Sequence, residues 1–169
     1  MSLTNKINKA QVLSQETIDE IEHWLKKFPK DKRESAIIPA LQASQKQNQG
    51  YLTDNLITEV AHYLQVPRAA VFEVATFYSL FNLKPVGKHQ IFVCTNIACM
   101  LCGCEKIVDY LKTKLNIELG ETTEDKKFTL KSVECLAACG GAPMMQIDEV
   151  YYENLTPEKV DKILEALDT

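Results

Sequence analysis

The sequence lacks the features that mark membrane, secreted and nucleic-acid-binding proteins. No apolar run approaches the roughly 18 residues that a membrane-spanning helix needs. There is no basic tract, and the formal net charge is -4, which argues against binding to nucleic acid or to an anionic membrane surface. The segment Met1–Lys9 carries lysines but no apolar core behind them, so it is not expected to act as a secretory signal. With 46% hydrophobic and 25% charged residues, the composition is that of a soluble globular protein.

Cysteine is absent from the first 93 residues, and all 6 cysteines fall between Cys94 and Cys139. A secreted disulfide scaffold spreads its cysteines through a short chain, whereas this chain has 169 residues and no export signal is evident. Clustered cysteines in a reducing compartment indicate a metal site or catalytic thiols.

The first half of the chain has the apolar spacing of helices. Ser14 can cap a helix that Pro29 closes, and a second helix is expected from about 33 to 49. Thr53 can cap a third helix, and Pro67 fits the first position of a fourth. This half carries no evident chemistry, so we expect residues 1–84 to form a helical domain.

A change of pattern follows the Pro- and Gly-containing segment 82–88, which is typical of a linker. Four strands and two helices are expected beyond it. The strands are expected at 90–93, 127–133, 144–147 and 150–152, and the helices around 107–115 and from Thr156 onward. This order indicates a small α/β domain over residues 85–169, with a sheet covered by helices.

Two cysteine pairs lie at the ends of predicted strands. Cys94 and Cys99 form a C-x4-C pair, and Cys135 and Cys139 form a C-x3-C pair. The carboxyl ends of strands are the usual location of a site in an α/β sheet, so the two loops can offer four thiolates to one centre. Each iron of a [2Fe–2S] rhomb takes two outer thiolates, which two short-range pairs supply. Backbone N–H groups of Gly140-Gly141 can hydrogen-bond the cluster's sulfurs.

Spacing alone leaves other sites open. Zinc also accepts four cysteines, and Cys99 and Cys102 have the C-x2-C spacing common in zinc sites. The same two residues could form a thiol–disulfide pair, which would leave Cys135 and Cys139 without a role. Buried structural thiols are the least favoured interpretation, because they do not explain the clustering. Cys102 and Cys104 are then expected to be packing or exposed thiols at the start of a helix. Rieske ligation is disfavoured because the 3 histidines lie outside the cysteine region.

The cysteine segments resemble a known family. The resemblance covers about residues 14–167 and is carried by Cys94–Gly103, Glu134–Cys139, Ala142–Met145, Val74–Tyr78 and Tyr151–Thr156. These motifs are similar to those of the 24 kDa (E) subunits of NADH–quinone oxidoreductase, respiratory complex I, which are thioredoxin-like [2Fe–2S] ferredoxins. The sequence departs from the family pattern at Cys102 and Cys104, which are not usually cysteine there, and at Ala137, where glycine is frequent.

The resemblance implies an N-terminal four-helix domain followed by a thioredoxin-like α/β ferredoxin domain. It implies that Cys94, Cys99, Cys135 and Cys139 ligate one [2Fe–2S] cluster. It also implies a flavoprotein partner subunit that holds FMN, a [4Fe–4S] cluster and the NADH site, together with other subunits of the peripheral arm. This chain has no G-x-G-x-x-G fingerprint and is not expected to bind NADH itself.

The implied location is cytoplasmic, peripheral on the inner face of the bacterial plasma membrane, or on the matrix side in a mitochondrion. The small subunits of NAD-linked hydrogenases and formate dehydrogenases share these motifs. They are the alternative to a subunit of complex I that the resemblance leaves open.

Overall fold

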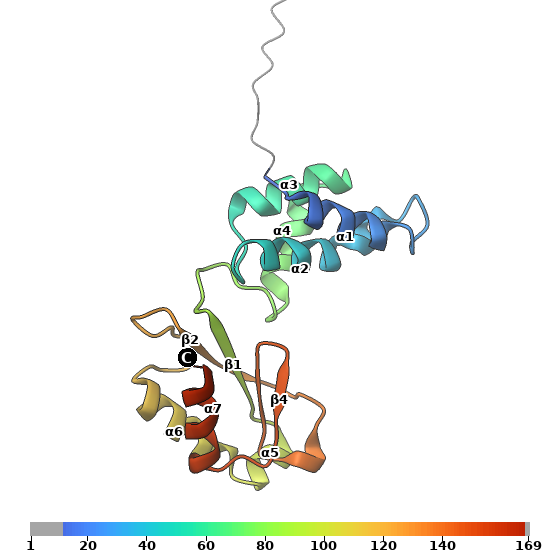
Figure 1. Cartoon of the computed structure of the whole chain (residues 1–169). Helices are drawn as coiled ribbons and strands as arrows, with labels where there is room; N and C mark the ends of the chain where they lie inside the picture. The colour runs from blue at the N-terminus through green and yellow to red at the C-terminus, as the bar shows by residue number, and fades with distance from the viewer. Residues whose placement is uncertain (1–11, 168–169) are drawn as a thin grey trace, which may run out of the picture. The chain divides into compact units, whose positions relative to one another are not determined.

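The computed structural model describes residues 12–167, which belong to two compact units spanning residues 1–85 and 86–169 (Figure 1). Each unit has a hydrophobic core of its own. Within the described residues, no helix is both long and apolar enough to cross a bilayer. The expectation for Met1–Lys9 concerns residues outside this range.

The first unit contains the four expected helices. They are α1 (Gln15–Leu25), α2 (Ile37–Gln47), α3 (Asp54–Leu64) and α4 (Arg68–Phe77). The Ser14 side chain accepts a hydrogen bond from the Thr17 N–H, and the Thr53 side chain accepts one from the Leu56 N–H, each at 3.2 Å. Both predicted N-caps are therefore confirmed, and each satisfies a backbone donor that has no partner within its helix.

Two helix boundaries differ from the sequence expectation. The second helix opens with a 3-10 turn, η1 (Arg33–Ala36), and ends at Gln47 rather than 49. Gly50 follows with φ 88°, and its N–H bonds the Gln45 carbonyl at 2.9 Å. Pro67 lies just before α4 instead of at its first position. The core of the unit is built from the apolar stripes of all four helices, with Ile21, Leu41, Ile57, Leu64, Val71 and Ala75 almost fully buried.

The boundary between the two units, after Pro85, falls inside the predicted linker 82–88, but both ends of this segment are fixed by contacts within a unit. Asn82 is buried in the first unit, where its carbonyl accepts from the Leu52 N–H and its side-chain amide donates to the Gly50 carbonyl, both at 2.7 Å. Gly87 belongs to the second unit, because its backbone lies directly against Lys127 and Phe128. Its N–H bonds the Thr129 hydroxyl at 2.7 Å. These contacts join segments far apart in the sequence, and local composition does not reveal them.

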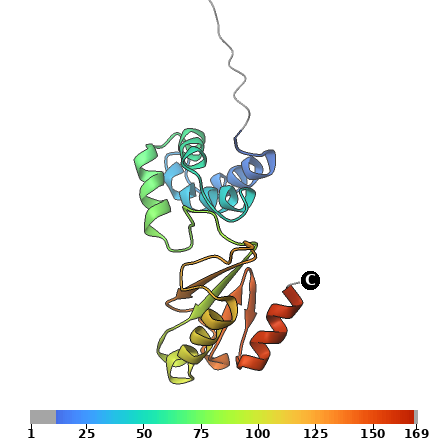
Figure 2. The same cartoon turned by 90° about the vertical axis from the view of Figure 1, so that its left-hand side faces the viewer.

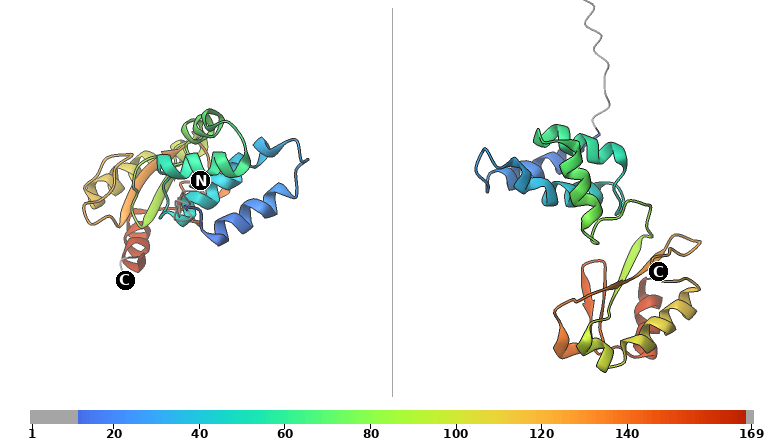
Figure 3. Two further views of the ribbon diagram at one scale, coloured as in Figure 1. Left: turned by 90° about the horizontal axis from the view of Figure 1, so that it is seen from above. Right: turned by 180° about the vertical axis from the view of Figure 1, so that it is seen from behind.

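The second unit is a four-stranded mixed sheet with helices (Figures 1 and 2). Its elements in order are β1 (His89–Cys94), α5 (Ile97–Leu101), α6 (Cys104–Leu115), β2 (Phe128–Val133), the 3-10 turn η2 (Cys139–Gly141), β3 (Met145–Ile147), β4 (Val150–Tyr152) and α7 (Pro157–Leu167). The strand order is β2-β1-β3-β4. Strands β1 and β2 are parallel, whereas the β1–β3 and β3–β4 pairs are antiparallel. Figure 3 shows the same ribbon from above and from behind.

Period-two alternation decides which face of the sheet is buried. Ile91 and Val93 of β1 are fully buried, while Phe92 between them is only partly buried. The buried residues pack with Leu111 of α6 and Val160 of α7 in one core. The expected α/β domain with a helix-covered sheet is confirmed, and the short helix α5 adds an element that the sequence pattern did not predict.

Gly87 provides a test of this packing. A Cβ on Gly87 would lie 2.8 Å from the Phe128 carbonyl carbon and 2.9 Å from that of Lys127, which is closer than backbone atoms allow. We expect Gly87→Ala to lower the free energy of unfolding of the second unit by about 1–3 kcal/mol, as overpacking does. Urea denaturation followed by circular dichroism measures this.

Gly140→Ala is the matched control, because a Cβ there meets no atom within 4 Å. If Gly87→Ala and Gly140→Ala have the same free energy of unfolding, the close approach at Gly87 does not determine the stability of the second unit.

Candidate metal centre

Parallel pairing of β1 and β2 places the two cysteine loops side by side. Cys94, the last residue of β1, is the register partner of Val133, the last residue of β2. The Thr95 N–H extends this pairing by one bond of 3.1 Å to the Val133 carbonyl. Cys135 follows two residues after the end of β2. The first residues of both loops are therefore held together by backbone hydrogen bonds.

The first cysteine pair lies inside the protein. The Asn96 side chain accepts a hydrogen bond of 2.7 Å from the Ile97 N–H at the start of α5, and this helix carries Cys99. Cys94 and Cys99 are 3% and 1% exposed and pack with Met144 in a small apolar cluster. The Cys94 N–H bonds the Met144 carbonyl at 3.2 Å, which fixes the end of β1 from its other side.

The second cysteine pair faces solvent. Cys135 and Cys139 are both exposed, and Cys139 is the first residue of the turn η2. The Ala137 N–H donates a hydrogen bond to the Cys135 sulfur at 3.3 Å, and Ala137 itself has a left-handed backbone, at φ 58°. Glycine adopts this conformation without the steric cost of a Cβ. The Ala142–Pro143 peptide that follows the turn is cis.

The two buried thiols of the first pair, Cys94 and Cys99, have different electrostatic surroundings. Burial raises the pKa of Cys99 to about 11, and the hydrogen bond with Cys94 adds to the rise. Burial also acts to raise the pKa of Cys94, but hydrogen bonds from the backbone of Asn96 and Leu136, together with those of Cys99 and Cys135, bring it below its ordinary value. Amide donors directed at a sulfur favour its thiolate form, which is the form that binds metal.

The donor chemistry of the two loops fits a two-iron centre. The Cys94 sulfur lies 3.9 Å from the carbonyl oxygen of Glu134, the residue that directly precedes Cys135 in the second loop. Zinc needs four ligands within about 2.3 Å of one point, whereas each iron of a [2Fe–2S] rhomb takes only two thiolates. Thiolate donors, amides near sulfur and the Gly140-Gly141 turn fit that cluster.

The two additional cysteines are placed as packing and surface thiols, as expected. Cys102 is exposed, and Cys104 is 1% exposed in the same apolar cluster as Cys94 and Cys99. Burial raises the pKa of Cys104 above its ordinary value, and the charge of Glu105 adds to this effect. Sequence reasoning had no signal for the amides of Asn96 and Leu136 near the Cys94 sulfur. The resemblance implied that glycine is frequent at position 137, but no left-handed backbone was predicted there.

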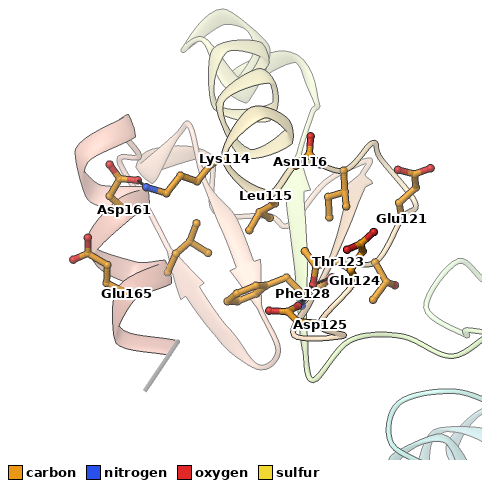
Figure 4. Close-up of a pocket in the computed structure, with 13 residues that line it drawn as sticks. Lys114, Leu115, Asn116, Glu121, Thr123, Glu124, Asp125, Phe128, Asp161 and Glu165 are labelled. Carbon is orange, nitrogen blue, oxygen red and sulfur yellow. Dashed lines mark hydrogen bonds and ion pairs between the residues drawn. The ribbon is translucent and has the colours of Figure 1, made fainter.

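A groove of about 840 Å³ lies away from the cysteines, between α6, the segment before β2 and α7 (Figure 4). Lys114 and Asp161 face each other across one side of it with an ion pair of 2.9 Å, and Glu121 and Asp125 lie along the other side. Its floor includes Phe128, which belongs to the core of the second unit. No cysteine lines this groove, so it is distinct from the candidate metal centre.

Strand-end cysteine loops on a helix-covered mixed sheet define a small thiolate-ligated metalloprotein of the α/β class. The chain belongs to the thioredoxin-like [2Fe-2S] ferredoxin family, whose model matches residues 21–168. The resemblance drawn from the cysteine motifs is therefore confirmed, and with it the [2Fe–2S] cluster as cofactor.

Several curated relatives carry one description. The chain is 49% identical over 144 residues to the E subunit of NADH-quinone oxidoreductase from Rickettsia felis, covering 85% of this chain and 86% of the relative. It is 43% identical over 162 residues to the E subunit from Rickettsia typhi, covering 96% and 95%. It is 45% identical over 148 residues to the E 2 subunit from Rhizobium meliloti, covering 88% and 86%.

Among solved structures, an NAD+-reducing [NiFe]-hydrogenase in its air-oxidised state has a similar fold. The TM-score is 0.66 with 20% sequence identity over 76% of this chain. This chain spans about a fifth of the length of that hydrogenase chain, 22%. At this identity the similarity concerns the fold.

Ala137 provides a test of the exposed ligand loop. We expect Ala137→Gly to remove the cost of a left-handed alanine, about 1–2 kcal/mol, less the extra entropy of glycine in the unfolded chain. The net result is a second unit stabilised by about 0.5–1 kcal/mol, measured by urea denaturation of the metal-free protein.

Ala138→Gly is the comparison variant, because Ala138 has φ -115° and gains nothing from glycine. A loss of stability in Ala137→Gly equal to that of Ala138→Gly would contradict the strain assigned to Ala137.

Proposed function

We propose that this chain is the electron-transfer subunit of an NADH–quinone oxidoreductase. In this proposal Cys94, Cys99, Cys135 and Cys139 ligate one [2Fe–2S] cluster, which exchanges single electrons with FMN of a partner flavoprotein subunit. The observation that carries the proposal is the meeting of the two cysteine loops at the ends of β1 and β2. The description of the relatives as E subunits of NADH-quinone oxidoreductase supplies the reaction.

The bound cluster supplies one-electron chemistry, whereas a hydride delivers two electrons that FMN can release one at a time. The chain's own residues set the surroundings of the centre. Cys94 and Cys99, which pack with Met144, would hold the cluster from the buried side. Cys135 and Cys139, which are exposed, would hold it from the surface, where a partner can approach. The Ala137 N–H near the Cys135 sulfur offsets part of the negative charge of the thiolates.

The partner surface in this proposal is formed by α5, the helix that carries Cys99. Ile97 and Leu101 of α5 are 66% and 79% exposed, and Met100 between them is also exposed. Apolar side chains with this exposure are typical of surfaces that a partner covers. The flavoprotein subunit is the proposed occupant, because this chain has no nucleotide-binding fingerprint of its own. The complex would hold the chain on the inner face of the plasma membrane.

A related assignment is the small diaphorase-type subunit of an NAD-linked hydrogenase or formate dehydrogenase. This assignment rests on the shared cysteine motifs, since the similarity to the NAD+-reducing hydrogenase, at 20% identity, concerns the fold alone. Genes beside this one distinguish the two assignments, since membrane-embedded proton-pumping subunits favour the quinone oxidoreductase. A zinc-stabilised interaction module is a remoter alternative, and metal analysis separates it from both.

The ligand assignment is tested with single Cys→Ser variants of the full chain, purified without oxygen. We expect wild-type protein to contain about two iron atoms and two acid-labile sulfides per chain, and to give an EPR signal after dithionite reduction. Serine at position 94, 99, 135 or 139 should abolish or strongly change that signal and lower the iron content.

Cys102→Ser is the matched control, because Cys102 lies three residues from Cys99 but is exposed. It should keep wild-type iron content and spectrum. Loss of the cluster in Cys102→Ser with a normal cluster in Cys99→Ser would overturn the assignment. Zinc and no iron in the wild type, after reconstitution as well, would overturn the proposed function.

A further inference from the structure

Glu153 lies directly against the turn that carries Cys139. Gly141 is the last residue of η2, two residues after Cys139. A Cβ on Gly141 would lie 2.5 Å from both the Cβ and the Cδ of Glu153 and closer still to its Oε2. The carboxylate therefore fills the space that the side chain of any other residue at position 141 would need. Gly141 does not have a positive φ, so close approach is its structural role here.

Backbone contacts hold Glu153 in this place. The segment that follows β4 runs alongside the second ligand loop. The Asn154 N–H donates to the Gly141 carbonyl at 2.6 Å, and the Leu155 N–H donates to the Pro143 carbonyl at 2.9 Å. Leu155 is 5% exposed and belongs to the core of the second unit. The backbone position of Glu153 beside the turn is thus determined by the fold.

The charge of Glu153 is not neutralised by an ion pair. Among the described residues, no Lys, Arg or His nitrogen forms an ion pair with its carboxylate, and the Lys159 ammonium donates to its backbone carbonyl instead. The side chain is exposed, so solvent screens its charge without removing it. A fixed negative charge beside a ligand loop opposes the addition of an electron to the centre, whereas an N–H donor near sulfur favours it.

We propose that Glu153 tunes the metal centre by its charge. Its carboxylate, which lies against Gly141, places a negative charge beside the turn that follows Cys139 and lowers the reduction potential of the cluster. This inference rests on the proposed function, in which reduced flavin supplies the electron. Glu153 transfers neither an electron nor a proton. A lower potential makes the centre a weaker acceptor, so that it returns its electron to the flavin more readily.

The decisive experiment compares Glu153→Gln with wild type in the purified full chain with its cluster. Glutamine keeps the shape of the side chain and removes its charge. We expect the midpoint potential, measured by anaerobic EPR-monitored redox titration, to shift to a less negative value. Iron content and the EPR line shape should stay those of the wild type, because the ligands are unchanged.

Glu149→Gln is the matched control for charge. Glu149 lies in the turn between β3 and β4, at the end of the hairpin where Asp148 bonds the Gln90 N–H at the start of β1. That end is remote from the cysteine loops, which follow the end of β1. Glu149→Gln also removes one exposed negative charge from the second unit, but it should leave the midpoint potential unchanged.

A second variant tests the contact itself. Gly141→Ala introduces the Cβ that displaces the Glu153 side chain, so it should also shift the midpoint potential upward. In that background Glu153→Gln should add a smaller shift than it does alone, because residues in contact are not additive.

An unchanged midpoint potential in Glu153→Gln, or a shift no larger than that of Glu149→Gln, overturns the inference. Loss of iron from Glu153→Gln would also overturn it, by showing that the carboxylate braces the loop and does not act by its charge. Absence of a cluster from the wild type is a separate result, which counts against the proposed function.

Discussion

The parallel pairing of β1 with β2 is the constraint on which the metal centre depends. The two strands are nearly 40 residues apart in sequence. Six register pairs, from His89–Phe128 to Cys94–Val133, bring their ends together. A shift of one residue would turn Ile91 and Val93 away from the helices and would move Cys94 relative to the second loop. The register that buries Ile91 and Val93 in the core therefore also sets where the thiols meet. A change that disturbs the pairing of the strands would also disturb the geometry of the site.

Local sequence patterns predict much of this architecture. The caps Ser14 and Thr53, the four helices of the first unit and the strands of the second all follow from spacing and turn chemistry within short windows. The candidate ligands could also be predicted, since their spacing and their place after strands are local features. The division of these ligands into a buried and an exposed pair could not be predicted. Burial of Cys94 and Cys99 depends on packing with Met144, which follows the second cysteine loop in the sequence.

Contacts between distant segments account for what the sequence did not reveal. Asn82 and Gly87 looked like linker residues because Pro and Gly lie near them, yet each is fixed by a segment more than 30 residues away. The contact of Glu153 with Gly141 likewise arises because the chain returns past the ligand loop after β4. Short-range periodicity carries no information on such approaches, since it reports only which side of one element is apolar. The positive φ of Ala137 is a local feature, but an alanine in the sequence does not predict it.

The separation into two cores has a spectroscopic consequence. Trp24 is the only tryptophan of the chain and lies in α1, whereas the chromophore of the cluster belongs to the other unit. Indole fluorescence and visible absorption therefore report on different bodies of the same polypeptide. Transitions recorded by the two signals need not coincide, and a mismatch between them would resemble a folding intermediate. It would instead reflect independent unfolding of the helical unit and loss of the cluster from the ferredoxin unit, so the two curves should not be fitted to one two-state transition.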